Sequence, residues 1–181
     1  MSISEILKKY RNIEIEILLA HVLNKPKEFL YMEPEYILTS YQLNILTKLI
    51  KRRQKGEPIA YILGYKGFLG LRFKVNKNVL VPRPETERLV EQVISNFQFI
   101  ISNGEPIRIL DVGTGSGAIA VSLAKQVQGA RSKVQVTASD ISDKALAVAK
   151  ENAKAHKVKI KFIKSNLLKN VKNNFDIIVA N

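Results

Sequence analysis

The chain has 181 residues, enough for one domain or two small ones, and 46% of them are hydrophobic, which is ample for a buried core. It has no cysteine and only two histidines, His21 and His156, which excludes disulfides and thiolate metal sites and argues against any metal centre. No apolar run approaches the roughly 20 residues of a membrane span, and the N-terminus lacks a secretory layout, so we expect a cytoplasmic protein without a membrane partner.

The chain is strongly basic, with a net charge of +13 from 29 Lys and Arg against 16 Asp and Glu. A phosphate-rich partner, such as a ribosome or a tRNA, would attract this charge. A lysine-rich surface that is simply solvated would give the same composition, and the lysines of residues 144–172 are scattered rather than interleaved with aromatic residues. Charge therefore leaves direct nucleic-acid binding open.

The N-terminal part of the sequence predicts helices. Ser2 and Glu5 have the spacing of a capping box, and apolar residues recur at helical spacing over about 13–24. Another helix is expected to begin near Ser40 and to end in a basic last turn before a glycine. We interpret residues 1–60 as a small helical domain.

A strand pattern follows the helices. Apolar residues alternate with polar or small residues over 68–81. The tripeptide 76–78, Asn-Lys-Asn, favours a turn, so we expect a β-hairpin that turns there. This hairpin would form a linker, residues 61–82, to a larger domain, residues 83–181.

Helices and strands then alternate. Pro84 has the position of a first helical residue and predicts a helix to about residue 102. The later segments predict, in order, strand 107–112, helix 117–128, strand 134–139, helix 143–156, strand 158–163 and strand 174–180. Short β-branched strands between amphipathic helices indicate an α/β fold with a parallel sheet buried on both faces, whose ligands bind at the carboxyl ends of the strands.

The most informative motif is the glycine loop Asp-Val-Gly-Thr-Gly-Ser-Gly, residues 111–117. Alternate glycines allow a sharp turn and present bare backbone N–H groups that a ligand can approach closely. The spacing differs from dinucleotide and phosphate-loop motifs, and no lysine follows it. Asp111 at its start and Asp140 at the next strand end suit a ligand with an amino-acid end and a ribose. That describes S-adenosylmethionine; a tight turn without a ligand is the alternative.

Five segments carry a resemblance to a known family. They are Gly56–Gly64, Phe68–Phe73, Val79–Glu87, Asp111–Gly117 and Phe175–Asn181. Together they resemble the peptide chain release factor glutamine methyltransferases, the HemK/PrmC family, over nearly the whole chain. The glycine loop marks only a broad superfamily, whereas the Pro-Arg-Pro-Glu-Thr-Glu segment is much more specific.

The resemblance implies methyl transfer from S-adenosylmethionine to the glutamine side-chain amide in the Gly-Gly-Gln motif of release factors. It also implies a helical N-terminal domain for substrate recognition and a Rossmann-like methyltransferase domain. The family's cofactor-binding positions match Gly113, Thr114, Gly115, Ser116 and Gly117 for the methionine part, Asp140 for the ribose and Leu167 for the adenine. Asn181 matches the first residue of the family's Asn-Pro-Pro-Tyr motif, so it is implied to be catalytic and to contact both cofactor and substrate.

The chain departs from the family at two places. Asn166 stands where many members have aspartate, and the residues Pro-Pro-Tyr do not follow Asn181. We therefore expect an incomplete sheet whose last strand lies beside the first as an unpaired apolar edge. On this hypothesis the chain is truncated and methylates poorly or not at all.

Other hypotheses stay open. The substrate could be a glutamine of a ribosomal protein, or an amino group of a nucleic acid, since loops of the Asn-Pro-Pro-Tyr type also hold adenine and cytosine. A non-catalytic binding module is a further alternative. Arg83 and Glu85 are candidates for cofactor-side or interdomain contacts, although their position at a helix entry favours a purely structural role.

Overall fold

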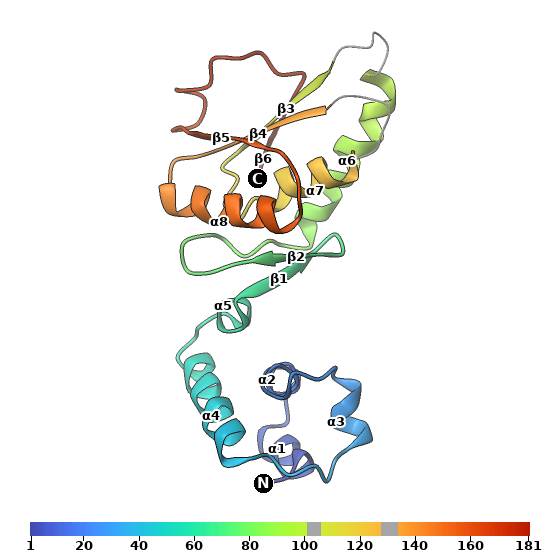
Figure 1. Cartoon of the computed structure of the whole chain (residues 1–181), viewed down its shortest axis with the longest axis vertical. Coiled ribbons are helices and arrows are strands. Elements are labelled where there is room, and N and C mark those ends of the chain that lie inside the picture. Colours follow the sequence, from blue (N-terminus) through green and yellow to red (C-terminus); the bar gives the residue numbers. More distant parts are fainter. Residues whose placement is uncertain (101–105, 128–133) are drawn as a thin grey trace. The chain divides into compact units, whose positions relative to one another are not determined.

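The structure is a computed structural model that describes residues 1–100, 106–127 and 134–181. It divides into two units, Met1–Leu63 and Gly64–Asn181, whose elements are labelled in Figure 1. The hairpin that the sequence predicts as a linker is grouped with the second unit.

The first unit is helical. Its elements are α1 (Ile3–Tyr10), α2 (Ile13–Leu23), α3 (Glu28–Met32), α4 (Ser40–Gln54) and α5 (Ile59–Leu63). The capping box is confirmed, because Ser2 and Glu5 each accept the other's backbone N–H. The sequence pattern does not predict α3 and α5, since a helix of five residues is too short to show a helical period.

A β-hairpin opens the second unit. Strand β1 (Tyr65–Phe68) pairs antiparallel with β2 (Leu71–Lys74), so the chain reverses at Leu69 and Gly70. A turn does form at Asn76–Val79, where the Val79 N–H donates to the Asn76 carbonyl at 3.1 Å, but the expectation that the hairpin reverses there is wrong. Leu69 and Gly70 both have positive φ, as in the tight turns that match strand twist, and the Leu69 N–H donates to Glu87 Oε1 at 3.0 Å. Glu87 lies 18 positions after Leu69 in the sequence, so no local sequence pattern predicts that it holds this turn.

The expected parallel sheet is confirmed. Its strands are β3 (Ile107–Val112), β4 (Val134–Asp140), β5 (Lys161–Lys164) and β6 (Ile177–Ala180), in the order β5-β4-β3-β6. As the resemblance implies, the last strand, β6, lies beside the first strand of this sheet, β3. Within the described residues β6 is an edge strand. Strand β5 begins later than expected because the Val158 N–H bonds back to the Ala153 carbonyl and ends the preceding helix.

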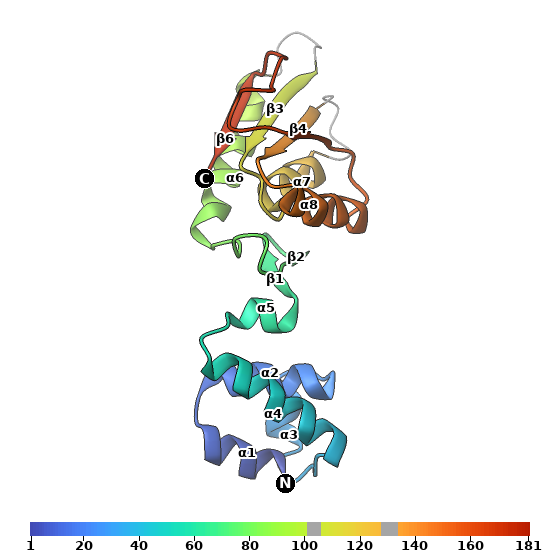
Figure 2. The same cartoon turned by 90° about the vertical axis from the view of Figure 1, so that its left-hand side faces the viewer.

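Helices cover one face of this sheet. The helices are α6 (Glu85–Ile100), α7 (Ala118–Gln126) and α8 (Asp143–Ala155), which are labelled in Figure 2. They contribute to a single core with inward side chains of β3, β4 and β6. On β6 the alternate side chains of Ile178 and Ala180 are exposed. The prediction that both faces are buried is wrong at this strand, because no helix of the described residues packs there.

Candidate functional site

A pocket opens at the carboxyl ends of β3 and β6, where parallel sheets bind ligands. It has a cavity volume of about 70 Å³ and lies within the second unit. One wall is the glycine loop, and the other is the segment between the hairpin and α6. Its lining residues are Leu80, Val81, Pro82, Arg83, Thr86, Gly113, Thr114, Gly115, Ser116, Ala118, Ile119 and Asn181. The structure therefore brings Asn181 together with four of the five predicted loop residues.

The three glycines of the loop have two different roles. All have positive φ, a conformation that disfavours other residues. A Cβ built on Gly113 would have no atom within 4 Å, and one on Gly115 would have only a backbone oxygen at 3.9 Å. At Gly117 the same atom would lie 3.1 Å from the Cβ of Ala149 on α8. Gly113 and Gly115 thus border open space, whereas Gly117 allows helix and loop to pack closely.

Most loop N–H groups are already engaged. The Thr114 N–H donates to the Ser139 carbonyl at 2.9 Å, the Gly115 N–H to Asp140 Oδ2 at 2.9 Å, and the Gly117 N–H to the Thr114 carbonyl at 2.8 Å. The prediction of bare amides is wrong for these three groups. The loop is instead fastened to the end of β4 and to itself, which fixes its shape.

Asp140 connects the loop to the start of α8. Its Oδ2 accepts from Gly115 and its Oδ1 accepts from the Ser142 N–H at 2.9 Å. Since a carboxylate offers about four lone-pair positions, two positions remain for hydroxyl donors. Leu167 does not line the pocket: it lies with positive φ in the turn after β5 and is 70% exposed.

Asp111 is a buried carboxylate beneath the loop. Its Oδ2 accepts from Thr114 Oγ1 at 2.6 Å and from the Ala120 N–H at 3.2 Å. Its Oδ1 is buried without a hydrogen-bond partner among the described residues. Burial raises the pKa of Asp111 to about 6, against the lowering effect of the two hydrogen bonds. An unpartnered buried carboxylate oxygen is a place where a positive group would be strongly favoured.

Asn181 is held by a residue that sequence reasoning missed. Its Nδ2 donates to Oγ1 of Thr86 at 2.7 Å, and Thr86 is buried in the first turn of α6. This contact uses the donor side of the amide, so the carbonyl oxygen of Asn181 is the side available to accept. The only sequence signal for Thr86 is its place in the most specific motif of the chain.

Other residues of that motif also have defined contacts. Arg83, for which a structural role is favoured on sequence grounds, lines the pocket. Glu87 holds the hairpin turn through Leu69. Glu85 begins α6, where its charge complements the helix dipole. The Pro-Arg-Pro-Glu-Thr-Glu segment therefore joins the hairpin, the pocket and Asn181.

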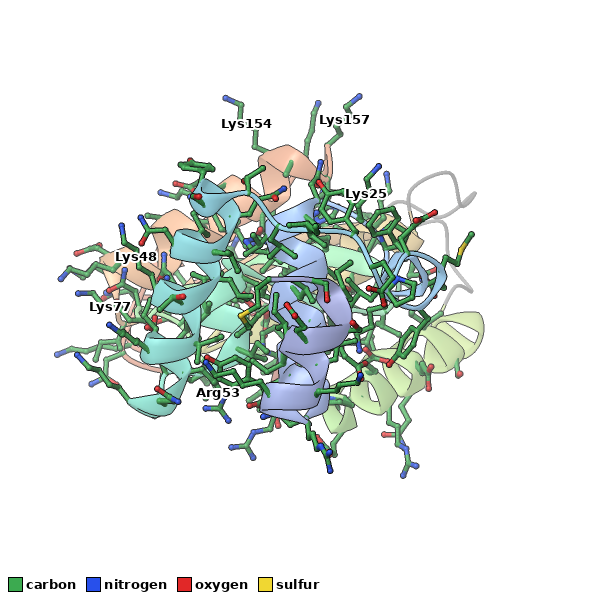
Figure 3. The ribbon with its side chains drawn as sticks, turned by 90° about the horizontal axis from the view of Figure 1, so that it is seen from below. Lys25, Lys48, Arg53, Lys77, Lys154 and Lys157 are labelled. Atoms are coloured by element: carbon green, nitrogen blue, oxygen red, sulfur yellow. The ribbon has the colours of Figure 1, made fainter. Side chains whose placement is uncertain are left out.

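The structure supplies few other candidates for a site. In the part of the chain that it describes, no three His, Cys, Asp or Glu residues are grouped to hold a metal ion. Nor is any described helix long and apolar enough to cross a membrane. Basic side chains extend into solvent from both units, among them Lys154 and Lys157 of the second unit (Figure 3).

Two family models match the chain. Residues 5–64 match a model described as PrmC N-terminal domain, and residues 98–181 match one described as Methyltransferase small domain. A protein of Lactococcus lactis named "Release factor glutamine methyltransferase" is 43% identical over 161 residues, which is 89% of this chain and 56% of that protein.

Two further relatives have the same name. One, from Coxiella burnetii, is 44% identical over 153 residues, and the other, from Flavobacterium psychrophilum, is 46% identical over 154 residues. In each case the match covers 84% of this chain and 52% of the relative. The chain thus spans about half the length of the curated relatives it matches.

The two roles of the glycines predict different costs of substitution. We expect Gly117→Ala to lower the free energy of unfolding by about 3 kcal/mol, from the left-handed backbone and the overpacking against Ala149 together. We expect Gly113→Ala to lower the free energy of unfolding by about 1 kcal/mol, because only the left-handed backbone is unfavourable there. Urea denaturation of both variants measures the difference, and equal losses would show that the contact with Ala149 is unimportant.

Proposed function

Because the chain belongs to the family of release factor glutamine methyltransferases, we propose that it binds S-adenosylmethionine and methylates the glutamine side chain in the Gly-Gly-Gln motif of peptide chain release factors. The helical unit would help to recognise the release factor in the cytoplasm. One observation carries the proposal: Asn181 lines the same pocket as the glycine loop. Asn181, whose side chain could orient an amide, and the glycine loop, which suits the cofactor, thus border the same pocket.

The glycine loop in the pocket wall and the carboxylates that hold it, which lie outside the pocket lining, fit this cofactor. The unpartnered Oδ1 of Asp111 suits the ammonium of an amino-acid end. The open space at Gly113 and Gly115 admits a ligand next to the backbone. Asp140 retains lone pairs for the ribose hydroxyls. Leu167 stays a predicted neighbour of the adenine.

The chain's own residues would act by orientation. S-adenosylmethionine, when bound, supplies an electrophilic methyl group on a positively charged sulfur. The nitrogen of a glutamine amide is a poor nucleophile because its lone pair is delocalised into the carbonyl. The carbonyl oxygen of Asn181 would accept an amide hydrogen and so fix the direction of that nitrogen. Thr86 would keep the Asn181 amide from rotating, and correct orientation would supply most of the rate.

The pKa of Asp111 predicts how cofactor binding depends on pH. An ammonium group pairs with the ionised carboxylate, and protonation below about pH 6 competes with it. We therefore expect the Kd for S-adenosylmethionine to be lowest between about pH 6 and pH 8, where the carboxylate is ionised and the ligand's α-amino group is protonated, and to rise up to about tenfold per pH unit below about pH 6. Calorimetric titration at several pH values measures this.

Two variants separate the effect of Asp111 from general effects of pH. Asp111→Asn should bind about tenfold or more weakly at neutral pH and should lose the pH dependence. Asp143→Asn removes an exposed carboxylate at the start of α8 and should behave as the native chain does. A native Kd that is the same at pH 5 and pH 8 would exclude Asp111 from ammonium binding.

The substrate is tested by offering three acceptors with S-adenosylmethionine labelled on its methyl group. A release factor, a ribosomal protein and a tRNA are incubated separately with the chain, and any label is expected on the release factor alone. Label on the ribosomal protein or tRNA would identify one of the alternative substrates. The absence of label on all three would contradict methyl transfer by this chain.

The contact between Thr86 and Asn181 predicts a selective loss of rate. Thr86→Val keeps the shape of the side chain but removes the acceptor, so we expect kcat to fall about tenfold to a hundredfold while the Kd for S-adenosylmethionine changes less than about twofold. Thr86→Ser retains the hydroxyl and should restore kcat. Equal effects of both substitutions on kcat would show that the hydroxyl is not needed.

A further inference from the structure

Asn152 is a buried polar residue on α8 that does not line the pocket. It is 2% exposed, and all of its amide is engaged. Its Oδ1 accepts from the Lys74 N–H at 2.8 Å, and its Nδ2 donates to the Lys74 carbonyl at 3.0 Å and to the Ser116 carbonyl at 2.8 Å. A fully satisfied buried amide fixes its partners more firmly than an apolar side chain of similar size could.

Two of these bonds hold the hairpin. Lys74 ends β2, and both of its backbone groups bind Asn152 as they would bind a neighbouring strand. Two other residues of the same region of α8 support this contact. Glu151 pairs with Lys74 Nζ at 2.6 Å, and a ring nitrogen of His156, at the end of the helix, lies 2.9 Å from the Arg72 carbonyl. The side chains of α8 thus complete one edge of the hairpin.

The third bond holds the glycine loop. Ser116 lines the pocket, and its carbonyl is fixed by Asn152 at the point where the loop enters α7. The chain that leaves Lys74 forms the opposite wall of the pocket a few residues later, at Leu80–Arg83. Asn152 therefore hydrogen-bonds the backbone of the glycine-loop wall at Ser116. It also hydrogen-bonds the backbone of Lys74, from which the chain continues to the opposite wall.

From this geometry we infer that Asn152 is a positioning residue for the cofactor loop, and that it couples the order of the loop to the docking of the hairpin. The inference rests on the proposed function, because it takes the glycine loop to be the site of S-adenosylmethionine. Without Asn152, Ser116 loses its partner and the loop can adopt other conformations. Only the fraction of molecules with the correct loop would bind the cofactor, so the affinity would fall accordingly.

The test compares two variants of the 181-residue chain. Asn152→Ala removes the bonds to both the hairpin and the loop, whereas His156→Ala removes a bond to the hairpin alone. We expect both to lower the Tm, but only Asn152→Ala to raise the Kd for S-adenosylmethionine about tenfold, with His156→Ala within about twofold of the native chain. Equal Kd values for the two variants would overturn the inference, because a purely structural role would affect both alike.

A second measurement needs no variant and so holds even if Asn152→Ala does not fold. In the native chain, S-adenosylmethionine should slow hydrogen exchange at the Lys74 amide, which bonds to Asn152 and lies outside the pocket lining. Slower exchange in the glycine loop with no change at Lys74 would overturn the coupling but leave the proposed function intact. A native chain that does not bind the compound in calorimetry would overturn the proposed function and this inference with it.

Discussion

The second unit is built around one buried carboxylate that its own fold leaves incompletely satisfied. Asp111 Oδ2 ties Thr114 of the glycine loop to Ala120 in the first turn of α7, so a single oxygen sets the path of the chain from strand to helix. The other oxygen is buried with no partner among the described residues. A buried polar atom without a partner requires a specific cause, such as stored strain, a catalytic role or a bound water or ion.

The remaining contacts of the loop explain why its shape is fixed without a ligand. Asp140 and Ser139 fasten it to the end of β4, and the absence of a side chain at Gly117 lets Ala149 of α8 approach it. The open side of the loop is confined to Gly113 and Gly115. Preorganisation of this kind reduces the entropy lost on binding, because the loop does not have to be ordered by the ligand.

Sequence reasoning succeeded where the signal is local and failed where it is tertiary. The capping box at Ser2, the parallel strands and the place of the glycine loop all follow from residues close together in sequence. The turn of the hairpin depends on Glu87, and the orientation of Asn181 depends on Thr86, 95 positions away. The loop amides looked bare for the same reason, since no periodicity shows that Asp140 accepts from one of them.

The charge of Asp111 links the stability of the second unit to pH. Its folded-state pKa of about 6 lies above the usual value of 3.8, so ionisation disfavours the folded state. The cost of ionisation is absent below about pH 4, develops as pH rises, and reaches about 3 kcal/mol above about pH 6. A cationic ligand that pairs with Oδ1 favours the ionised form and offsets that cost. A ligand with an ammonium group would therefore stabilise the second unit most near neutral pH, where the carboxylate is ionised and the ammonium still carries its proton.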